Sequence, residues 1–130
     1  ALPVDLPYGI ELRNPTWLHG EWFSWLARHR IAPVLIQGYW MEDITRTIAR
    51  YQDLIGETVS LRLHGEDREE IESVTSGSWD TRIQPRDREL VSIAQSITSL
   101  ATGPRVVYVQ VNNHYEGSAP LTIERLRQLL

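Results

Sequence analysis

Three short segments of this chain carry polar side chains two residues apart, with one apolar residue between the two. Successive side chains of a β-strand point to opposite faces, so the two polar residues of each segment would share a face. A carboxylate, guanidinium groups, an imidazole and amides gathered on one face could bind an anion and move a proton. The pairs are Glu11 and Arg13, Arg62 and His64, and Gln110 and Asn112.

The charged members of this set can divide the work of a binding or catalytic site. Arg13 and Arg62 offer planar, permanently charged forks that suit phosphate or carboxylate. His64 can act near neutral pH as an acid, a base or a ligand, and Glu11 can hold an arginine in place or serve as a base. Since buried charges must be paired, the same residues could instead form a structural ion network.

Amide and aromatic side chains supply a second group of candidates. Asn112 and Asn113 can each donate and accept hydrogen bonds, which suits the orientation of a polar ligand. Trp79 lies in a long loop and Tyr115 follows the last expected strand, and aromatic faces in such places can stack on bases or sugars. The alternative is that these aromatic residues pack loops against the ends of the strands.

The elements that must position these residues alternate between strand and helix four times. Apolar residues at helical spacing, such as Leu90, Ile93, Ala94, Ile97 and Leu100, mark the faces that helices would bury. The stretch 65–84 is charged first and then rich in serine and glycine, and it is expected to be a loop with one helical turn at 67–73. Strands are expected at 8–13, 33–37, 58–64 and 105–112, and helices at 20–30, 41–55, from 85 to about 101, and from 120 onward.

Helices between the strands imply parallel pairing, which conflicts with the polar faces. Strands of a small open sheet with helices on both sides are normally apolar on both faces. Strands of an eight-unit (β/α)8 barrel, which takes about 250 residues, have one face on the helices and one inside the barrel, with the active site at their C-terminal ends. The sequence therefore predicts an α/β fold of four consecutive βα units, with residues 1–130 forming a single domain or a TIM-type half-barrel of a longer chain.

Three runs of sequence resemble the YecE-like family, a barrel family of unknown function. GIELRNPTW at 9–17 is similar to its mid-barrel strand, LRLHG at 61–65 to its next-to-last strand, and VYVQVNNHYEGSAPLTIERL at 107–126 to its closing strand and helix. The three runs are specific as an ordered set and weak singly. Their order implies the C-terminal half of the barrel.

Carried over by position, the family's small residues fall on Gly117 and Ala119. Asn14 stands where the family often has histidine, which puts in doubt any role that needs an imidazole there. At the level of fold the family resembles barrel enzymes of the endonuclease IV type, an analogy that does not fix function. The family's polar motif residues fall on Glu11, Arg13, Arg62, His64, Asn112 and Asn113.

Composition narrows the classes of function. The formal net charge of -4 gives no bulk attraction to nucleic acid or to an anionic membrane. The absence of cysteine excludes disulfides and thiolate metal sites, and the histidines and carboxylates show no tight metal-ligand spacing. No residue is therefore assigned to a metal, and the cofactors stay unknown. No apolar run approaches the about 18 residues of a membrane span, and a cytoplasmic location is expected.

The preferred function is that of a hydrolase or lyase acting on a phosphorylated or nucleotide-like ligand at the C-terminal ends of the strands. His64 and Glu11 are the predicted catalytic residues. The alternatives are a non-catalytic binding module and an ion network with no ligand. Because open strand edges invite pairing, the expected partner is the missing N-terminal half of the barrel or a second copy of the chain. The predicted ligand-binding residues are Arg13, Arg62, Asn112, Asn113, Tyr115 and Trp79.

Overall fold

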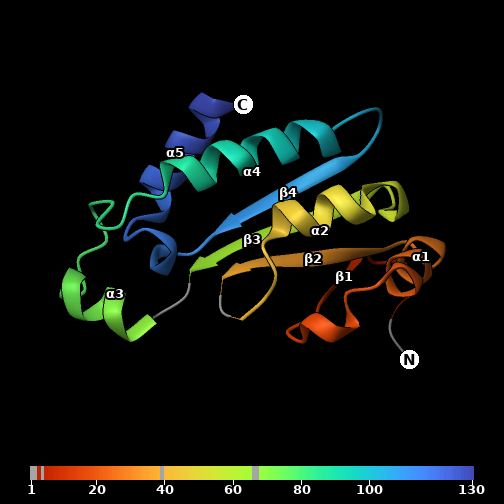
Figure 1. Ribbon diagram of the computed structural model, residues 1–130, viewed down its shortest axis with the longest axis horizontal. Helices are drawn as coiled ribbons and strands as arrows, with labels where there is room; N and C mark the ends of the chain where they lie inside the picture. Colours follow the sequence, from red (N-terminus) through yellow and green to blue (C-terminus); the bar gives the residue numbers. More distant parts are fainter. Residues whose placement is uncertain (1–2, 4, 39, 66–67) are drawn as a thin grey trace.

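The computed structural model describes residues 3, 5–38, 40–65 and 68–130, which form a four-stranded parallel sheet alternating with helices. The strands lie side by side in the order of the chain and all run in one direction (Figure 1). Each predicted strand is confirmed, with shifts at its ends. The strands are β1 (Tyr8–Glu11), β2 (Ile31–Gly38), β3 (Thr58–Gly65) and β4 (Val106–Val111).

Helices follow each strand, and a further helix lies between β3 and the third predicted helix. None of the described helices is long and apolar enough to cross a lipid bilayer. Short 3-10 turns follow β1, α2 and β4: η1 (Pro15–Trp17), η2 (Gln52–Leu54) and η3 (Asn113–Tyr115). The α-helices are α1 (Gly20–Arg28), α2 (Ile44–Tyr51), α3 (Arg68–Thr75), α4 (Asp87–Leu100) and α5 (Ala119–Leu129).

Two local differences from the predicted elements affect the site. β1 ends at Glu11, so Arg13 lies just beyond the strand, because Asn14 accepts a hydrogen bond from the backbone of Thr16 and starts η1. The stretch predicted as a loop with one turn contains all of α3. This helix buries Ile71 and carries an ion pair between Arg68 and Glu72, and the weak sequence pattern predicted only part of it.

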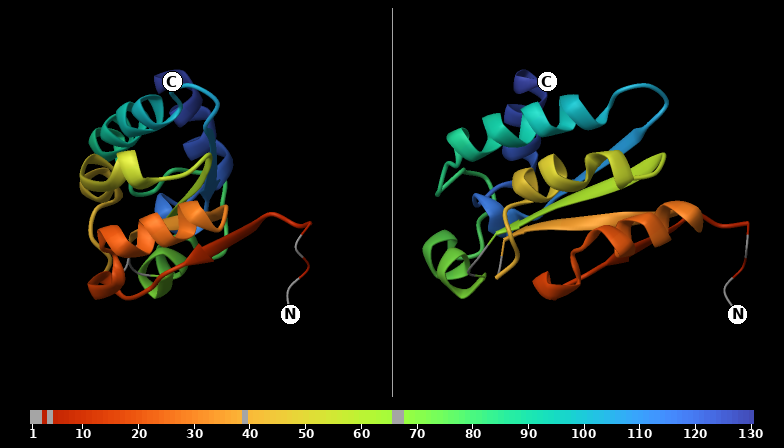
Figure 2. Two further views of the ribbon diagram at one scale, coloured as in Figure 1. Left: turned by 90° about the vertical axis from the view of Figure 1, so that its right-hand side faces the viewer. Right: turned by 45° about the vertical axis from the view of Figure 1, so that its right-hand side comes forward.

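The hydrophobic core lies on one face of the sheet, under the helices. Leu61 and Leu63 of β3 point into it together with Phe23 of α1, Ile44 of α2 and Leu90 of α4. These side chains are almost fully buried, and shortening one such leucine to alanine would cost about 2–5 kcal/mol. The helices that follow the strands therefore cover the same face, and α3 lies at the C-terminal end of the sheet (Figure 2).

The second face of the sheet, here called the open face, is not covered by a helix within the described residues. Tyr108 and Val106 of β4 lie on it with 58% and 48% of their surfaces exposed. Strand register places Glu11, Ser60 and Tyr108 in one row across this face. Arg62 and Gln110 lie one row nearer the C-terminal ends of the strands, so the predicted shared face is confirmed for Glu11, Arg62 and Gln110.

Candidate functional site

Glu11 on the open face bridges two arginines, and the three residues are called the open-face cluster. Its Oε2 accepts a hydrogen bond from Nη1 of Arg62 at 2.8 Å, and its Oε1 accepts one from Nε of Arg13, also at 2.8 Å. β2 lies between the two strands that carry Glu11 and Arg62. Ile36 of β2, in the same row as Arg62, is only 2% exposed, which indicates that the charged side chains lie over it.

The two arginines of this cluster keep the Glu11 carboxyl group ionised, and their two positive charges exceed its one negative charge. Partial burial by itself would raise the pKa of Glu11, but hydrogen bonds and charges from Arg62 and Arg13 outweigh it and hold the pKa below the ordinary value. Glu11 is therefore a carboxylate at neutral pH, better suited to holding arginines than to removing a proton. The side chains of Arg62 and Arg13 keep 26% and 53% of their surface exposed.

His64 lies one residue before the end of β3, on the same face as Arg62 by strand parity. It is 8% exposed. Burial lowers the pKa of His64, and the positive charge of Arg62 lowers it further, with smaller effects from His114 and Arg13; a backbone hydrogen bond at Gly65 opposes them. The imidazole is therefore neutral at pH 7 and can accept a proton from a ligand.

A second histidine faces His64 at the same end of the sheet. The ring of His114, in η3, lies 6.4 Å from that of His64 between centroids and is inclined to it by 18°. Trp79 meets His114 edge-on at 5.2 Å, and Nε2 of His114 lies 3.2 Å from Oε1 of Glu72 on α3. Gly65 allows this approach, because a side chain there would collide with the carbonyl of His114.

The two predicted asparagines mainly organise the backbone at this end of the sheet. The backbone N–H of Asn112 donates to the carbonyl of Leu63 at 2.9 Å, which continues the pairing of β3 and β4 up to the level of His64. Oδ1 of Asn113 accepts from the backbone N–H of Ala119 at 2.9 Å and so caps the start of α5. The contribution of either amide to a ligand remains a prediction.

Tyr115 lies in the core, whereas the sequence predicts that it contacts a ligand. The residue is fully buried within the hydrophobic core, and its hydroxyl donates to a carboxylate oxygen of Glu89 on α4. Burial and this carboxylate raise the pKa of the Tyr115 hydroxyl far above its ordinary value. The turn η3 directs Tyr115 toward α4, so its hydroxyl serves the fold.

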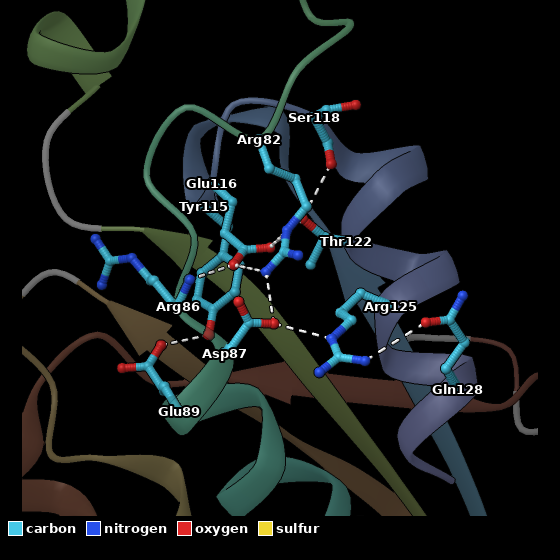
Figure 3. A network of polar contacts seen from close by, with 10 residues as sticks. All are labelled: Arg82, Arg86, Asp87, Glu89, Tyr115, Glu116, Ser118, Thr122, Arg125 and Gln128. Carbon is cyan, nitrogen blue, oxygen red and sulfur yellow. Dashed lines mark hydrogen bonds and ion pairs between the residues drawn. The ribbon is translucent and has the colours of Figure 1, made fainter.

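A buried ion network behind η3, here called the buried clasp, is not predicted from the sequence (Figure 3). Its centre is Glu116, whose side chain is 0% exposed. Oε2 accepts from Nε of Arg82 at 2.9 Å and from the Thr122 hydroxyl at 2.6 Å. Oε1 accepts from Nη2 of Arg82 at 2.7 Å and from the backbone N–H of Arg86. Asp87 joins Arg82 to Arg125 at the edge of the clasp.

The clasp fixes the loop that carries Trp79. The backbone N–H of Gln84 donates to the carbonyl of Glu116 at 3.1 Å, and Gly117, with φ of +107°, allows the backbone of Thr81 to pass closely. Burial by itself would raise the pKa of Glu116, but the hydrogen bonds from Arg82, Thr122 and the Arg86 backbone lower it. The loop is therefore held against η3, beside His114.

The structure thus brings most of the predicted charged residues together at the C-terminal end of the sheet. Among the described residues, no group of three or more histidine and carboxylate side chains is arranged to hold a metal ion. The model of a protein family described as "Protein of unknown function DUF72" matches residues 1–130. No curated protein matches the chain, and no solved structure matches it.

Proposed function

We propose, from the premise that this chain belongs to the DUF72 family of proteins of unknown function, that its open face binds a phosphorylated or nucleotide-like ligand. The observation that carries the proposal is the open-face cluster, in which Glu11 holds Arg13 and Arg62 on the same side of the sheet as His64. The narrower relationship to YecE-like proteins rests on the three sequence runs and belongs to this proposal.

The arginines supply the affinity for the anion. A guanidinium has five N–H donors, and the bond to Glu11 uses one of those of Arg62. Two guanidinium groups against one carboxylate leave a positive charge at the cluster. Each charge-assisted contact to a phosphate oxygen would contribute about 1.5–3 kcal/mol. A phosphate at the strand ends would therefore contact the guanidinium groups of both Arg13 and Arg62.

His64 supplies the reactive group in the enzymatic form of the proposal. In hydrolysis, the neutral imidazole would take a proton from water as the water oxygen bonds to phosphorus and the P–O bond to the leaving alcohol breaks. In a lyase reaction it would take the proton from carbon as the phosphorylated group leaves with the bonding electrons. A non-catalytic binding module would bind the ligand through the same arginines without converting it. Measurement of product therefore distinguishes the enzyme from the binding module.

The architecture of the proposal is the C-terminal half of a (β/α)8 barrel. Sequential strand order, parallel pairing, helices on one face and an open face with polar rows near the C-terminal strand ends support it. Four further βα units would cover Tyr108 and Val106, large apolar side chains that edge strand β4 leaves exposed on the open face. A dilute, monomeric chain of residues 1–130 with a cooperative melt in sedimentation and calorimetric experiments would contradict this arrangement.

Titration calorimetry on the full-length protein tests the binding. Inorganic phosphate, a phosphate monoester and a nucleoside monophosphate would be titrated at pH 7 and at two salt concentrations. We expect binding that weakens with salt, because an arginine–phosphate contact is electrostatic. Release of phosphate or of an elimination product, abolished in His64→Gln while measurable binding remains, would establish the enzyme. A folded protein that binds none of the three ligands would leave the cluster a structural ion network.

A further inference from the structure

His114 is the strongest additional candidate at the C-terminal end of the sheet. We infer that His114, oriented by Glu72, is a second imidazole of the anion site and contacts the phosphate of the ligand together with His64. The inference rests on the proposed function and deepens it. It adds a ligand-contacting residue from η3 and a positioning residue from α3 to a site otherwise built from β1 and β3.

His114 lies next to His64 at the C-terminal end of the sheet. The rings of His114 and His64 lie 6.4 Å apart and nearly parallel, and the backbones of β3 and η3 touch at Gly65. His114 keeps 20% of its side chain exposed, so a ligand at the strand ends can reach it. Arg62, Arg13 and His114 each lie close enough to His64 to lower its pKa, so the four residues share one neighbourhood.

Glu72 of α3 orients the ring of His114. Nε2 of His114 lies 3.2 Å from Oε1 of Glu72. The pKa of Glu72 is lowered by hydrogen bonds from Arg68 and then from His114, so the group is a carboxylate and can only accept. Nε2 therefore donates to Glu72, and Nδ1 is left for the ligand: it can accept from a protonated phosphate oxygen or, once the ring is protonated, donate to an ionised one. A carboxylate that fixes the tautomer of a histidine is a recurrent arrangement at sites where the imidazole must present one defined nitrogen.

Neighbouring side chains on two sides hold the His114 ring in place. Trp79 meets the edge of the His114 ring at 5.2 Å, and the buried clasp holds the Trp79 loop to the residues that directly follow His114. The ring is therefore fixed by α3 on one side and by the loop on the other. This rigidity keeps two imidazoles close to two guanidinium groups, whose positive charge opposes protonation of the rings unless an anion is bound.

The test combines nuclear magnetic resonance with titration calorimetry on the full-length protein. Ring signals of His19, His29, His64 and His114 would be followed while inorganic phosphate is added. We expect the signals of His64 and His114 to shift with one affinity and those of His19 and His29 to stay in place. Glu72→Gln should change the tautomer signals of His114 and weaken phosphate binding severalfold, and His114→Gln should weaken it at least fivefold, with the melting temperature retained.

His29→Gln is the matched control. His29 also contacts a tryptophan, at 4.2 Å from the Trp25 ring, and bonds the Trp25 carbonyl at 2.8 Å, but it lies on α1. Its replacement should leave phosphate affinity unchanged. If phosphate binds the parent but His114→Gln binds it equally tightly, His114 is structural and this inference fails while the proposed function stands. If the folded parent binds no phosphate and no ring signal moves, the proposed function fails as well.

Discussion

Two regions of this molecule are built from the same chemical groups, a glutamate bonded to arginine, in opposite environments. In the buried clasp, the side chain of Glu116 is 0% exposed and its two oxygens accept four hydrogen bonds, two of them from Arg82. In the open-face cluster, the side chain of Glu11 is 20% exposed and its oxygens accept one bond each, from Arg13 and Arg62.

This difference in exposure suits the buried clasp to a structural role and leaves the open-face cluster able to contact a ligand. Glu116 has its bonding capacity filled by the loop before α4 and by α5, so the clasp joins elements and offers nothing to a ligand. Glu11 leaves its arginines partly exposed at the C-terminal ends of parallel strands, where ligands of barrel proteins bind. Ion pairing alone therefore does not identify a site, and exposure together with position is what makes the open-face cluster the candidate.

The largest expected effect is on stability, from Glu116→Gln. Removal of this charge leaves the largely buried guanidinium of Arg82 with Asp87 as its remaining carboxylate partner, which costs about 3 kcal/mol. Glu11→Gln should cost much less, about 1 kcal/mol, because water can solvate the arginines that remain. Urea unfolding at pH 7 measures both variants. Equal losses would show that the open-face cluster is as structural as the buried clasp.

A second contrast exchanges arginine for lysine in each region. Arg62→Lys keeps the charge but loses the planar fork, so phosphate binding should weaken by about 1.5–3 kcal/mol, which is roughly ten- to a hundredfold. Arg82→Lys should lower the free energy of unfolding and leave the phosphate affinity of the folded protein unchanged. Calorimetric titration and urea unfolding of both variants provide the comparison. Undiminished phosphate binding by Arg62→Lys would make the arginine structural.

The third contrast is the response to acid. The pKa of Glu116 and that of Glu11 are both lowered by folding, so the unfolded chain binds more protons than the folded one in the acid range. Their contribution to stability is therefore present above the ordinary glutamate value of 4.5 and is lost as pH falls below it. We expect Glu116→Gln to remove more of this acid sensitivity than Glu11→Gln, as measured by unfolding between pH 3 and 7. An unchanged pH dependence in Glu116→Gln would contradict the assigned role of the clasp.

The smallest expected effect comes from a pair that belongs to neither region. Arg50 and Glu42 meet at 3.2 Å on the surface, and 55% of the Arg50 side chain is exposed. Solvent screens such pairs, so Arg50→Gln should change neither the melting temperature nor phosphate affinity measurably. A clear loss of phosphate affinity in this variant would show that net charge, and not the geometry of the open-face cluster, drives binding.

The residues of the open-face cluster can be predicted from the sequence because the pattern that marks them is local. Glu11 and Arg13, and Arg62 and His64, each lie within three consecutive residues of one segment, so strand parity assigns their face without knowledge of the fold. Sequence reasoning did not reach the buried clasp or the pairing of His114 with Glu72. Arg82 and Glu116 are 34 residues apart, and His114 and Glu72 are 42 residues apart. No periodicity connects them.

The sequence by itself determined the alternating strands and helices, the apolar stripe of α4 and the face that Glu11 and Arg62 share, since these follow from repeat periods of two and 3.6 residues. Tertiary structure alone decided that Tyr115 enters the core, that α3 brings Glu72 to His114, and that Arg82 closes on Glu116. Those contacts depend on the path of turns and loops through space. The path is set by the packing of whole elements against one another, and no single segment of the sequence encodes it.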